Sequence, residues 1–221
     1  MPNWCDNQVT ITGPNSVIDK IEKIVKEESN NAENGLLQFF HPMPKELLET
    51  EAGPIAKTKA EKDERKSRKL EFGAENWYDW RVNNWATKWE VCEFYGVDRQ
   101  YLSEQSEGES TISFAFSSAW SPPIGAYEKF LEKNEDCSLK AYYYEGGCDF
   151  MGEWDNGVDD CYATSDYKST DDFWQDGIGS TLDDMFNITE SMAEYEAEQE
   201  AEKEDVHEYV KGNKINIGEE A

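Results

Sequence analysis

Apart from the carboxylates, few side chains in this sequence could do covalent or metal chemistry. The chain has two histidines, His41 and His207, and five cysteines. A nucleophile–His–carboxylate arrangement would have to use His41, because His207 lies in a strongly acidic tail. Cys92, Cys148 and Cys161 could meet His41 in a zinc site, but nothing in their spacing requires it.

Other catalytic signals are missing from the sequence. No G-x-S-x-G, Walker or G-x-G-x-x-G pattern appears. The segment from Asp155 to Asp160 looks like a calcium loop, but it lacks the required order of acidic positions and the distal Glu. We therefore expect no catalytic activity, no metal and no cofactor. An uncharacterised enzyme remains an alternative, because carboxylates are abundant.

Aromatic residues gather in residues 76–89, which hold four of the eight tryptophans. Trp77 and Trp80 are three residues apart, a spacing that puts both on one face of a helix. Aromatic stripes of this kind usually pack into a core, which is the first interpretation. The alternative is an aromatic recognition surface, for which Trp77, Trp80 and Trp120 are the candidates. On that view the function is binding of single-stranded nucleic acid or of nucleotides, with Tyr142 and Tyr144 as further stacking positions.

Carboxylates dominate the charge of the chain. It has 48 acidic and 21 basic residues and a formal net charge of −27, which argues against direct binding of duplex DNA. Residues 145–205 contain twenty acidic and two basic residues. Regularly spaced carboxylates can imitate the phosphates of DNA, which carries one charge per ~1.7 Å of duplex axis. We therefore expect an acidic surface that binds a basic partner protein, with these candidate residues: Asp171, Asp172, Asp183, Asp184, Glu194, Glu196, Glu198, Glu200 and Glu202.

Residues 57–69 are the only net-basic segment of any length, with seven basic and three acidic residues. The preferred interpretation is a solvated helical insertion, because mixed charge runs are usually solvent faces. The alternatives are a site for an anion or for the acidic tail of the same chain. The acidic tail could equally serve only to increase solubility.

The periodicity of apolar residues predicts the elements that must position these side chains. Helical spacing predicts helices at residues 17–28 and 124–131, and alternation predicts strands at 7–12, 89–94, 110–116, 138–145 and 148–154. The order is typical of an α+β ferredoxin-like split βαβ fold, an antiparallel sheet with helices on one face. We expect this domain at residues 1–155, with a helical insertion at 45–88. An acidic, partly helical C-terminal extension follows at 156–221.

Five blocks of sequence carry a family resemblance. They are Met1-Pro-Asn-Trp-Cys-Asp-Asn7, Phe40-His-Pro-Met-Pro-Lys-Glu-Leu47, Trp77-Tyr-Asp-Trp80 with Asn84-Trp-Ala-Thr-Lys-Trp89, Phe116-Ser-Ser-Ala-Trp-Ser-Pro-Pro123, and Tyr144-Glu145 with Phe150-Met-Gly152. In this order they resemble the YubB-type ferredoxin-like family, whose largely uncharacterised members are carried by bacteriophages and conjugative plasmids. The resemblance covers about residues 1–155 and departs at Ala86, where the family pattern has glycine.

The resemblance implies a phage or mobile-element source and a bacterial cytoplasmic setting, with no established activity. No apolar run approaches the ~18–20 residues needed to span a bilayer, and the N-terminus does not read as a secretory signal. We therefore expect a phage-encoded cytoplasmic protein. It would bind, and could inhibit, a host defence or DNA-processing protein through a DNA-mimic surface.

Overall fold

The computed structural model describes residues 3–27, 34–53, 58–102 and 108–197. The chain divides into two units, Met1–Tyr162 and Ala163–Ala221, and each is described by itself below. Among the described helices, none has both the length and the apolar character that a membrane crossing requires.

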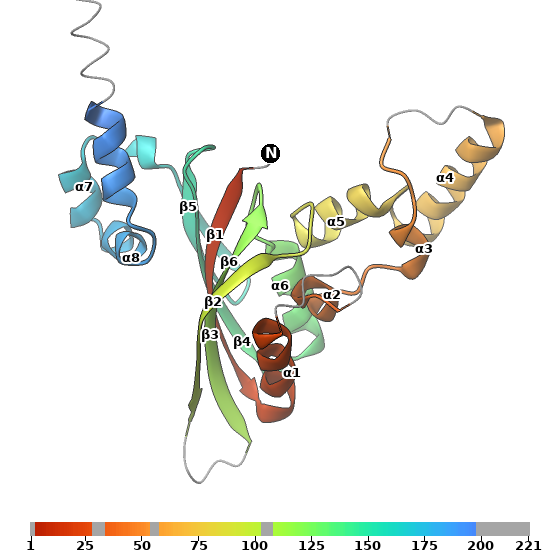
Figure 1. The fold of residues 1–221 in the computed structure, drawn as a ribbon, viewed down its shortest axis with the longest axis horizontal. Helices are drawn as coiled ribbons and strands as arrows, with labels where there is room; N and C mark the ends of the chain where they lie inside the picture. The colour runs from red at the N-terminus through yellow and green to blue at the C-terminus, as the bar shows by residue number, and fades with distance from the viewer. Residues whose placement is uncertain (1–2, 28–33, 54–57, 103–107, 198–221) are drawn as a thin grey trace, which may run out of the picture. The chain divides into compact units, whose positions relative to one another are not determined.

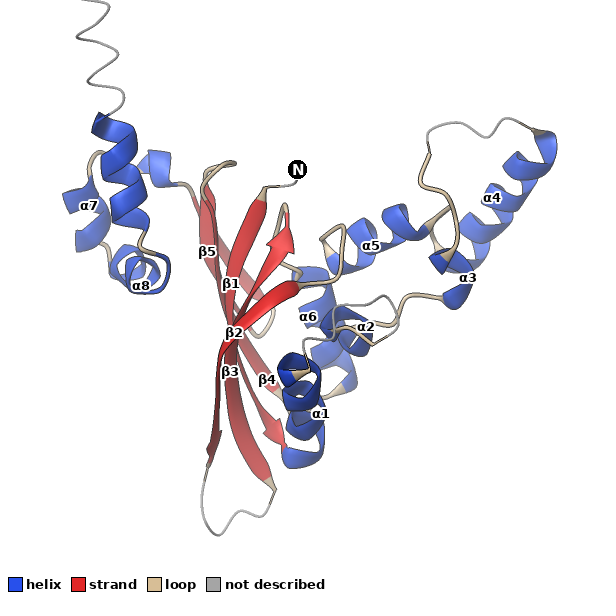
Figure 2. Ribbon diagram, viewed as in Figure 1, coloured by secondary structure: helices blue, strands red, loops and turns tan. Residues whose placement is uncertain are grey.

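Six antiparallel strands form one sheet in the first unit, in the order β2-β3-β1-β4-β5-β6 (Figure 1). Their bounds are β1 Trp4–Pro14, β2 Cys92–Tyr101, β3 Glu109–Ala119, β4 Ser138–Glu145, β5 Phe150–Asp155 and β6 Val158–Tyr162. Helices α1 (Asn15–Lys26) and α6 (Ile124–Lys133) cover one face of this sheet (Figure 2). The molecule is therefore an α+β protein with an antiparallel sheet, as the sequence predicted.

The alternation of apolar and polar residues along β1 determines which face of the sheet packs against the core. Val9 and Ile11 are fully buried, whereas Thr10 and Thr12, which alternate with them, are only half-buried. On that second face Thr10 shares a hydrogen bond with Ser113 (2.9 Å), and Thr12 shares one with Thr111 of β3 (2.8 Å). The period-two pattern of the sequence thus records one apolar face and one hydroxyl-rich face.

The prediction differs from the structure at both edges of the sheet. The expected strand at 89–94 begins only at Cys92 and continues to Tyr101, with register shifts on either side of Tyr95. These bulges break the alternation that would reveal a strand. At the other edge β6 was not predicted, because Asn156 and Gly157 lay in the calcium-like segment. They form the two-residue turn of a β5–β6 hairpin, with φ of +48° and +101°. The first unit therefore ends at Tyr162, later than the predicted boundary at 155.

Helix α2 (Leu36–Phe40) precedes the predicted helical insertion at 45–88, which contains α3 (Lys45–Leu48), α4 (Lys59–Phe72) and α5 (Trp77–Trp85). Helix α4 begins with a capping box between Thr58 and Glu61 and buries no residue, so its expected solvated character is confirmed. Helix α5 is capped by Asn76, whose side chain accepts the backbone N–H groups of Tyr78 and Asp79. It ends at Ala86, which lies in the left-handed region (φ +66°).

The second unit is built from short helices around a small core of Phe173, Leu182 and Ile188. Its elements are η1 (Thr164–Asp166), α7 (Thr170–Gln175), α8 (Gly177–Phe186) and a helical stretch at 188–197. Helix α8 ends at Asn187, a non-glycine residue with φ +54°. Of the described residues of the acidic extension, 158–162 form strand β6 and most of 164–197 are helical.

Candidate functional site

The predicted acidic surface lies in the second unit. Asp171, Asp172, Asp184, Glu194 and Glu196 are exposed. The other three glutamates predicted for this surface, Glu198, Glu200 and Glu202, lie outside the described residues.

Asp183 has a structural role, which corrects its assignment to a free acidic surface. Its carboxylate is half-buried and accepts the backbone N–H of Thr189 (2.7 Å) and the hydroxyl of the same residue (3.0 Å). It therefore fixes the chain reversal after α8, where Asn187 interrupts the helix.

Among the described residues of the second unit, no cation forms an ion pair with the exposed carboxylates. Lys168 is the one basic residue in residues 163–197, and none of the ion pairs between described residues involves this stretch. Two aromatic side chains also reach solvent here, Trp174 (49% exposed) and Tyr195 (64% exposed). The described part of the unit thus presents uncompensated negative charge beside large apolar side chains.

The tryptophan stretch is mostly core, as the first interpretation predicted. Trp85 is fully buried and donates its indole N–H to the backbone carbonyl of His41 (2.8 Å). Trp80 is only 4% exposed and packs edge-to-face on Trp85, with ring centroids 5.8 Å apart. This corrects the assignment of Trp80 to a recognition surface, because contact with Trp85 and with the ring of His41 (4.9 Å) removes it from solvent.

A buried Arg–Glu arrangement supports this core. The guanidinium of Arg81 lies between the rings of Trp77 (5.2 Å) and Trp85 (4.9 Å), and its Nε has no hydrogen-bond partner among the described residues. Burial lowers the pKa of Arg81, and the nearby Glu90 opposes that shift. The Glu90 carboxylate accepts the backbone N–H of Leu37 (2.7 Å), and burial raises its pKa to about 7.

Several aromatic side chains remain at the surface around Lys88. Its ammonium lies 4.3 Å from the centroid of the Trp89 ring and 5.9 Å from that of Tyr78. Trp89 in turn contacts Trp4 (6.2 Å between centroids). Trp120 is 45% exposed and has a φ of +73°, a strained conformation for a bulky residue. We call Trp4, Tyr78, Lys88, Trp89 and Trp120 the aromatic–lysine surface.

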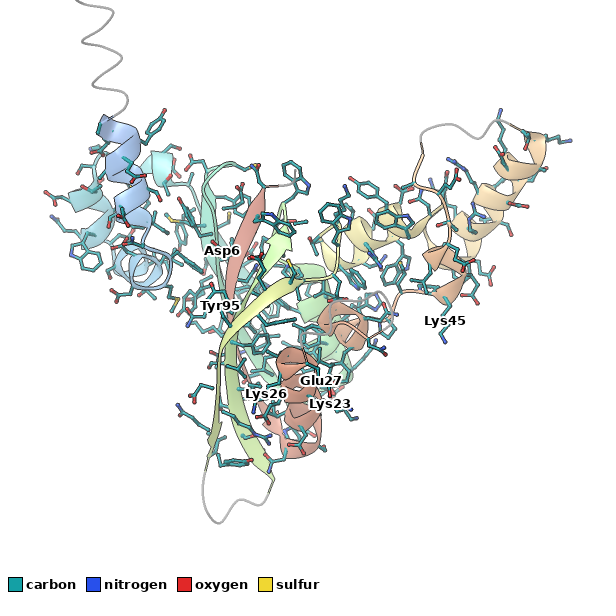
Figure 3. All side chains as sticks on the ribbon, viewed as in Figure 1. Asp6, Lys23, Lys26, Glu27, Lys45 and Tyr95 are labelled. Carbon is teal, nitrogen blue, oxygen red and sulfur yellow. The ribbon has the colours of Figure 1, made fainter. Side chains whose placement is uncertain are left out.

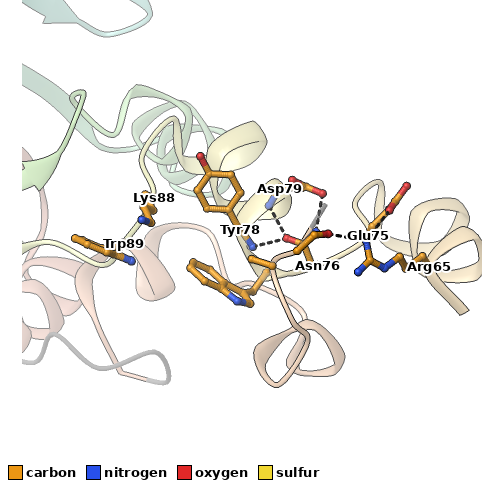
Figure 4. Close-up of a pocket in the computed structure, with 10 residues that line it drawn as sticks. Arg65, Glu75, Asn76, Tyr78, Asp79, Lys88 and Trp89 are labelled. Carbon is orange, nitrogen blue, oxygen red and sulfur yellow. Dashed lines mark hydrogen bonds and ion pairs between the residues drawn. The ribbon is translucent and has the colours of Figure 1, made fainter. Parts of the chain in front are cut away.

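Two hollows flank Tyr78 and Lys88. The larger, of about 760 Å³, lies between α4 and the start of α5 (Figure 4). It is lined by Ala52, Gly53, Arg65, Glu75, Asn76, Trp77, Tyr78, Asp79, Lys88 and Trp89. The smaller, of about 240 Å³, is lined by Tyr78, Val82, Ala86, Thr87, Lys88, Ala119, Trp120 and Ser121. Trp77 and Trp120, both predicted as surface aromatics, thus line different hollows.

The histidine and cysteine side chains do not assemble into the sites considered from the sequence. His41 Nε2 lies 3.3 Å from the amide oxygen of Asn84, and burial lowers the pKa of the imidazole. Cys92 lies on edge strand β2, whereas Cys161 lies on β6 at the opposite edge. Five strand spacings of ~4.8 Å separate them by about 24 Å. No group of three or more His, Cys, Asp or Glu residues in the described part of the chain could hold a metal ion.

The sequence reasoning missed one pair of carboxylates. The hydroxyl of Ser117 lies 3.3 Å from Asp6 Oδ1 and 3.4 Å from Glu93 Oε2, so three strands bring these groups together. Burial, and secondarily Glu93, raises the pKa of Asp6, and Tyr95 lies close by (Figure 3). Glu93 has a φ of +58° at the β2 bulge. No linear pattern links residues 6 and 93, because β3 lies between their strands.

The comparisons with known proteins identify no family for this chain. No protein-family model matches the chain, and no curated protein matches it. A solved structure that it resembles is described as the crystal structure of a protein api92 from Yersinia pseudotuberculosis, family model DUF1281. The identity is 12% and the TM-score is 0.38, over 76% of this chain and 96% of that chain.

Proposed function

We propose that this chain is a bacteriophage-encoded interaction protein. In this proposal its acidic second unit binds, and inhibits, a basic host protein of defence or DNA processing. One observation carries the proposal: the exposed carboxylates of the described second unit have no cationic partners. Unpaired surface charge costs little in water, and it attracts a partner of opposite charge over about a Debye length.

The spacing of the carboxylates determines how many helices of the second unit must contribute to a DNA-mimic surface. Residues 188–197 span about 15 Å of helix and carry three carboxylates, or one per ~5 Å. Duplex DNA carries one charge per ~1.7 Å of axis. This helix alone is therefore about three times too sparse to imitate a duplex. A DNA-mimic surface requires the carboxylates of α7 and α8 as well, such as Asp171, Asp172 and Asp184.

Exposed aromatics supply the second ingredient of a protein interface. Trp174 on α7 and Tyr195 are about half and two-thirds exposed. Large aromatic side chains often carry much of the binding energy of protein interfaces, whereas exposed charge mainly steers association. A carboxylate array with such anchors favours a protein partner over a role in solubility alone.

For the first unit we propose the ferredoxin-like plan, with β5 and β6 added at one edge of the sheet. The supporting observations are the order β2-β3-β1-β4, the antiparallel β1–β3 and β1–β4 pairs, and the crossover helices α1 and α6. The resemblance of residues 1–155 to the YubB-type family supports a phage or mobile-element source and action in the bacterial cytoplasm.

The test is affinity capture from bacterial lysate at low and at high salt, read by mass spectrometry. The wild type is compared with a variant in which five exposed carboxylates of the second unit become amides: Asp171→Asn, Asp172→Asn, Asp184→Asn, Glu194→Gln and Glu196→Gln. A matched control neutralises five exposed carboxylates of the first unit: Glu46→Gln, Glu51→Gln, Glu128→Gln, Glu135→Gln and Asp136→Asn.

The proposal expects that wild type and control recover the same DNA-binding protein at low salt. That protein should be lost at high salt and with the second-unit variant. Because several helices contribute charge, variants with fewer changes should lose binding in steps. Recovery that survives all five second-unit changes, or that falls equally in the control, would contradict the proposal.

A further inference from the structure

We propose that the 760 Å³ pocket between α4 and the start of α5 binds a nucleoside monophosphate. The proposal goes beyond the acidic interaction surface, because it uses residues of the first unit that the proposed function leaves unexplained. The volume is in the range usual for small-molecule sites. The walls combine aromatic rings with two cations, Arg65 and Lys88, and two carboxylates, Glu75 and Asp79, so the pocket offers partners for the base and for the phosphate of a nucleotide (Figure 4).

The aromatic walls suit a flat heteroaromatic ring. Trp77, Tyr78 and Trp89 all line the pocket, and Trp77 meets Tyr78 edge-to-face with centroids 5.8 Å apart. Tyr78 is 39% exposed, so ring surface remains available to a ligand. Bases stack on such rings whatever their identity, because every base has a π face.

Lys88 decides the sign of the ligand's charge. Its ammonium lies 4.3 Å from the centroid of the Trp89 ring, a distance at which the ring face attracts a cation. It forms no ion pair with any described carboxylate, although the chain has a net charge of −27. An anionic group on the ligand is therefore the missing partner, and a phosphate accepts from an ammonium well.

Arg65 is less available than Lys88. One of its guanidinium nitrogens donates to the carbonyl of Gly53 (2.8 Å) and lies 3.9 Å from Glu75. The pocket therefore offers one free cation among the described residues. Because the protein as a whole repels polyanions, one phosphate fits this site better than a nucleic-acid strand.

Asp79 gives the site a means of reading the base. Its Oδ2 accepts a hydrogen bond from the side-chain amide of Asn76 (2.7 Å), which fixes the carboxylate. Its Oδ1 has no donor among the described residues and can accept from an exocyclic amino group. Adenine, guanine and cytosine carry such a group and uracil does not, so uridine monophosphate should bind most weakly.

The experiment is calorimetric and fluorescence titration of the full chain at low salt with AMP, GMP, CMP and UMP. The corresponding nucleosides, inorganic phosphate, a short thymidine oligonucleotide and an arginine-rich peptide serve as comparison ligands. The variants are Lys88→Gln and Asp79→Asn. The matched control is Lys45→Gln, because Lys45 is an exposed lysine on α3 (Figure 3) and does not line the pocket.

Lys88→Gln should weaken AMP binding about tenfold, the loss expected for one charge-assisted contact, and should leave adenosine binding unchanged. Asp79→Asn should reduce the preference for AMP, GMP and CMP over UMP. Lys45→Gln should behave as wild type. The nucleoside comparison separates a phosphate contact from a general loss of structure, because misfolding would weaken both ligands.

Any one of four results would overturn the proposal. These are no nucleotide binding at millimolar concentration, equal effects of Lys88→Gln and Lys45→Gln, inorganic phosphate binding as tightly as AMP, and tighter binding of the oligonucleotide or the peptide than of AMP.

Discussion

Replacement of Glu90 by glutamine should remove a pH-dependent part of the stability of this protein. Glu90 is 7% exposed, and burial raises its pKa from the ordinary value of 4.5 to about 7. Three backbone N–H groups, those of Leu37, Gln38 and Val91, donate to the carboxylate and oppose that shift. The folded protein therefore holds this proton more tightly than the unfolded chain does.

The direction in which stability changes with pH follows from this difference in proton affinity. The stabilisation from the protonated carboxyl is complete below about pH 4.5 and is lost as the pH rises to about 7. At about 1.36 kcal/mol per pKa unit, the whole effect is roughly 3 kcal/mol, of which about 2.5 kcal/mol falls between about pH 5 and about pH 8. Glutamine cannot ionise, so the free-energy difference between wild type and Glu90→Gln should shrink by that amount over this window.

Urea unfolding at several pH values measures this difference directly. Glu128→Gln, an exposed change on α6, is the control and should keep the wild-type pH profile. The absolute stability of Glu90→Gln is not the readout, because its amide places an N–H group against backbone donors. Parallel pH profiles of wild type and Glu90→Gln would refute the reasoning, since the carboxyl would then have the same pKa in both states.

Three further predictions concern stability, two read from unfolding curves and one from local proteolysis. Trp80→Ala should cost about 3–5 kcal/mol because the buried indole leaves a cavity, whereas Trp120→Ala should cost far less because the side chain is half-exposed; equal losses would contradict the packing described. Ala86→Gly should stabilise by about 1 kcal/mol, because φ is +66° there, and a loss of stability would contradict that backbone conformation. Asp183→Ala should destabilise the second unit by about 1–2 kcal/mol through loss of the bonds to Thr189, with local proteolysis near residue 187 as the readout.

Much of the fold could be predicted because burial leaves a period in the sequence. Strand β1 alternates buried and half-buried residues along its length, and α1 buries Ile18, Ile21 and Val25 at helical spacing. The same logic found only the start of β2, where the predicted strand at 89–94 overlaps it, because bulges disturb the pairing of this edge strand. It failed for β6 because the acidic residues of this strand give no apolar alternation. The turn residues Asn156 and Gly157 are the main sequence signal of the β5–β6 hairpin.

The candidate site was less accessible to sequence reasoning. Trp80 and Trp120 are the same residue type, and only the tertiary structure buries one and exposes the other. Lys88 was not singled out, because its lack of an ionic partner is a property of three dimensions. The pair Asp6 and Glu93 was missed for a similar reason. Strand pairing brings these two positions together, and no local spacing in the sequence relates them.

The two edges of the sheet also bear on how this protein avoids self-association. A free strand edge presents unpaired backbone groups that can template pairing with another molecule. At one edge β2 is bulged, and at the other the short β6 carries Asp159 and Asp160, both exposed. Irregular backbone and like charge both oppose edge-to-edge pairing between copies. The acidity of the chain thus has a colloidal consequence as well, because like net charge makes copies repel one another in solution.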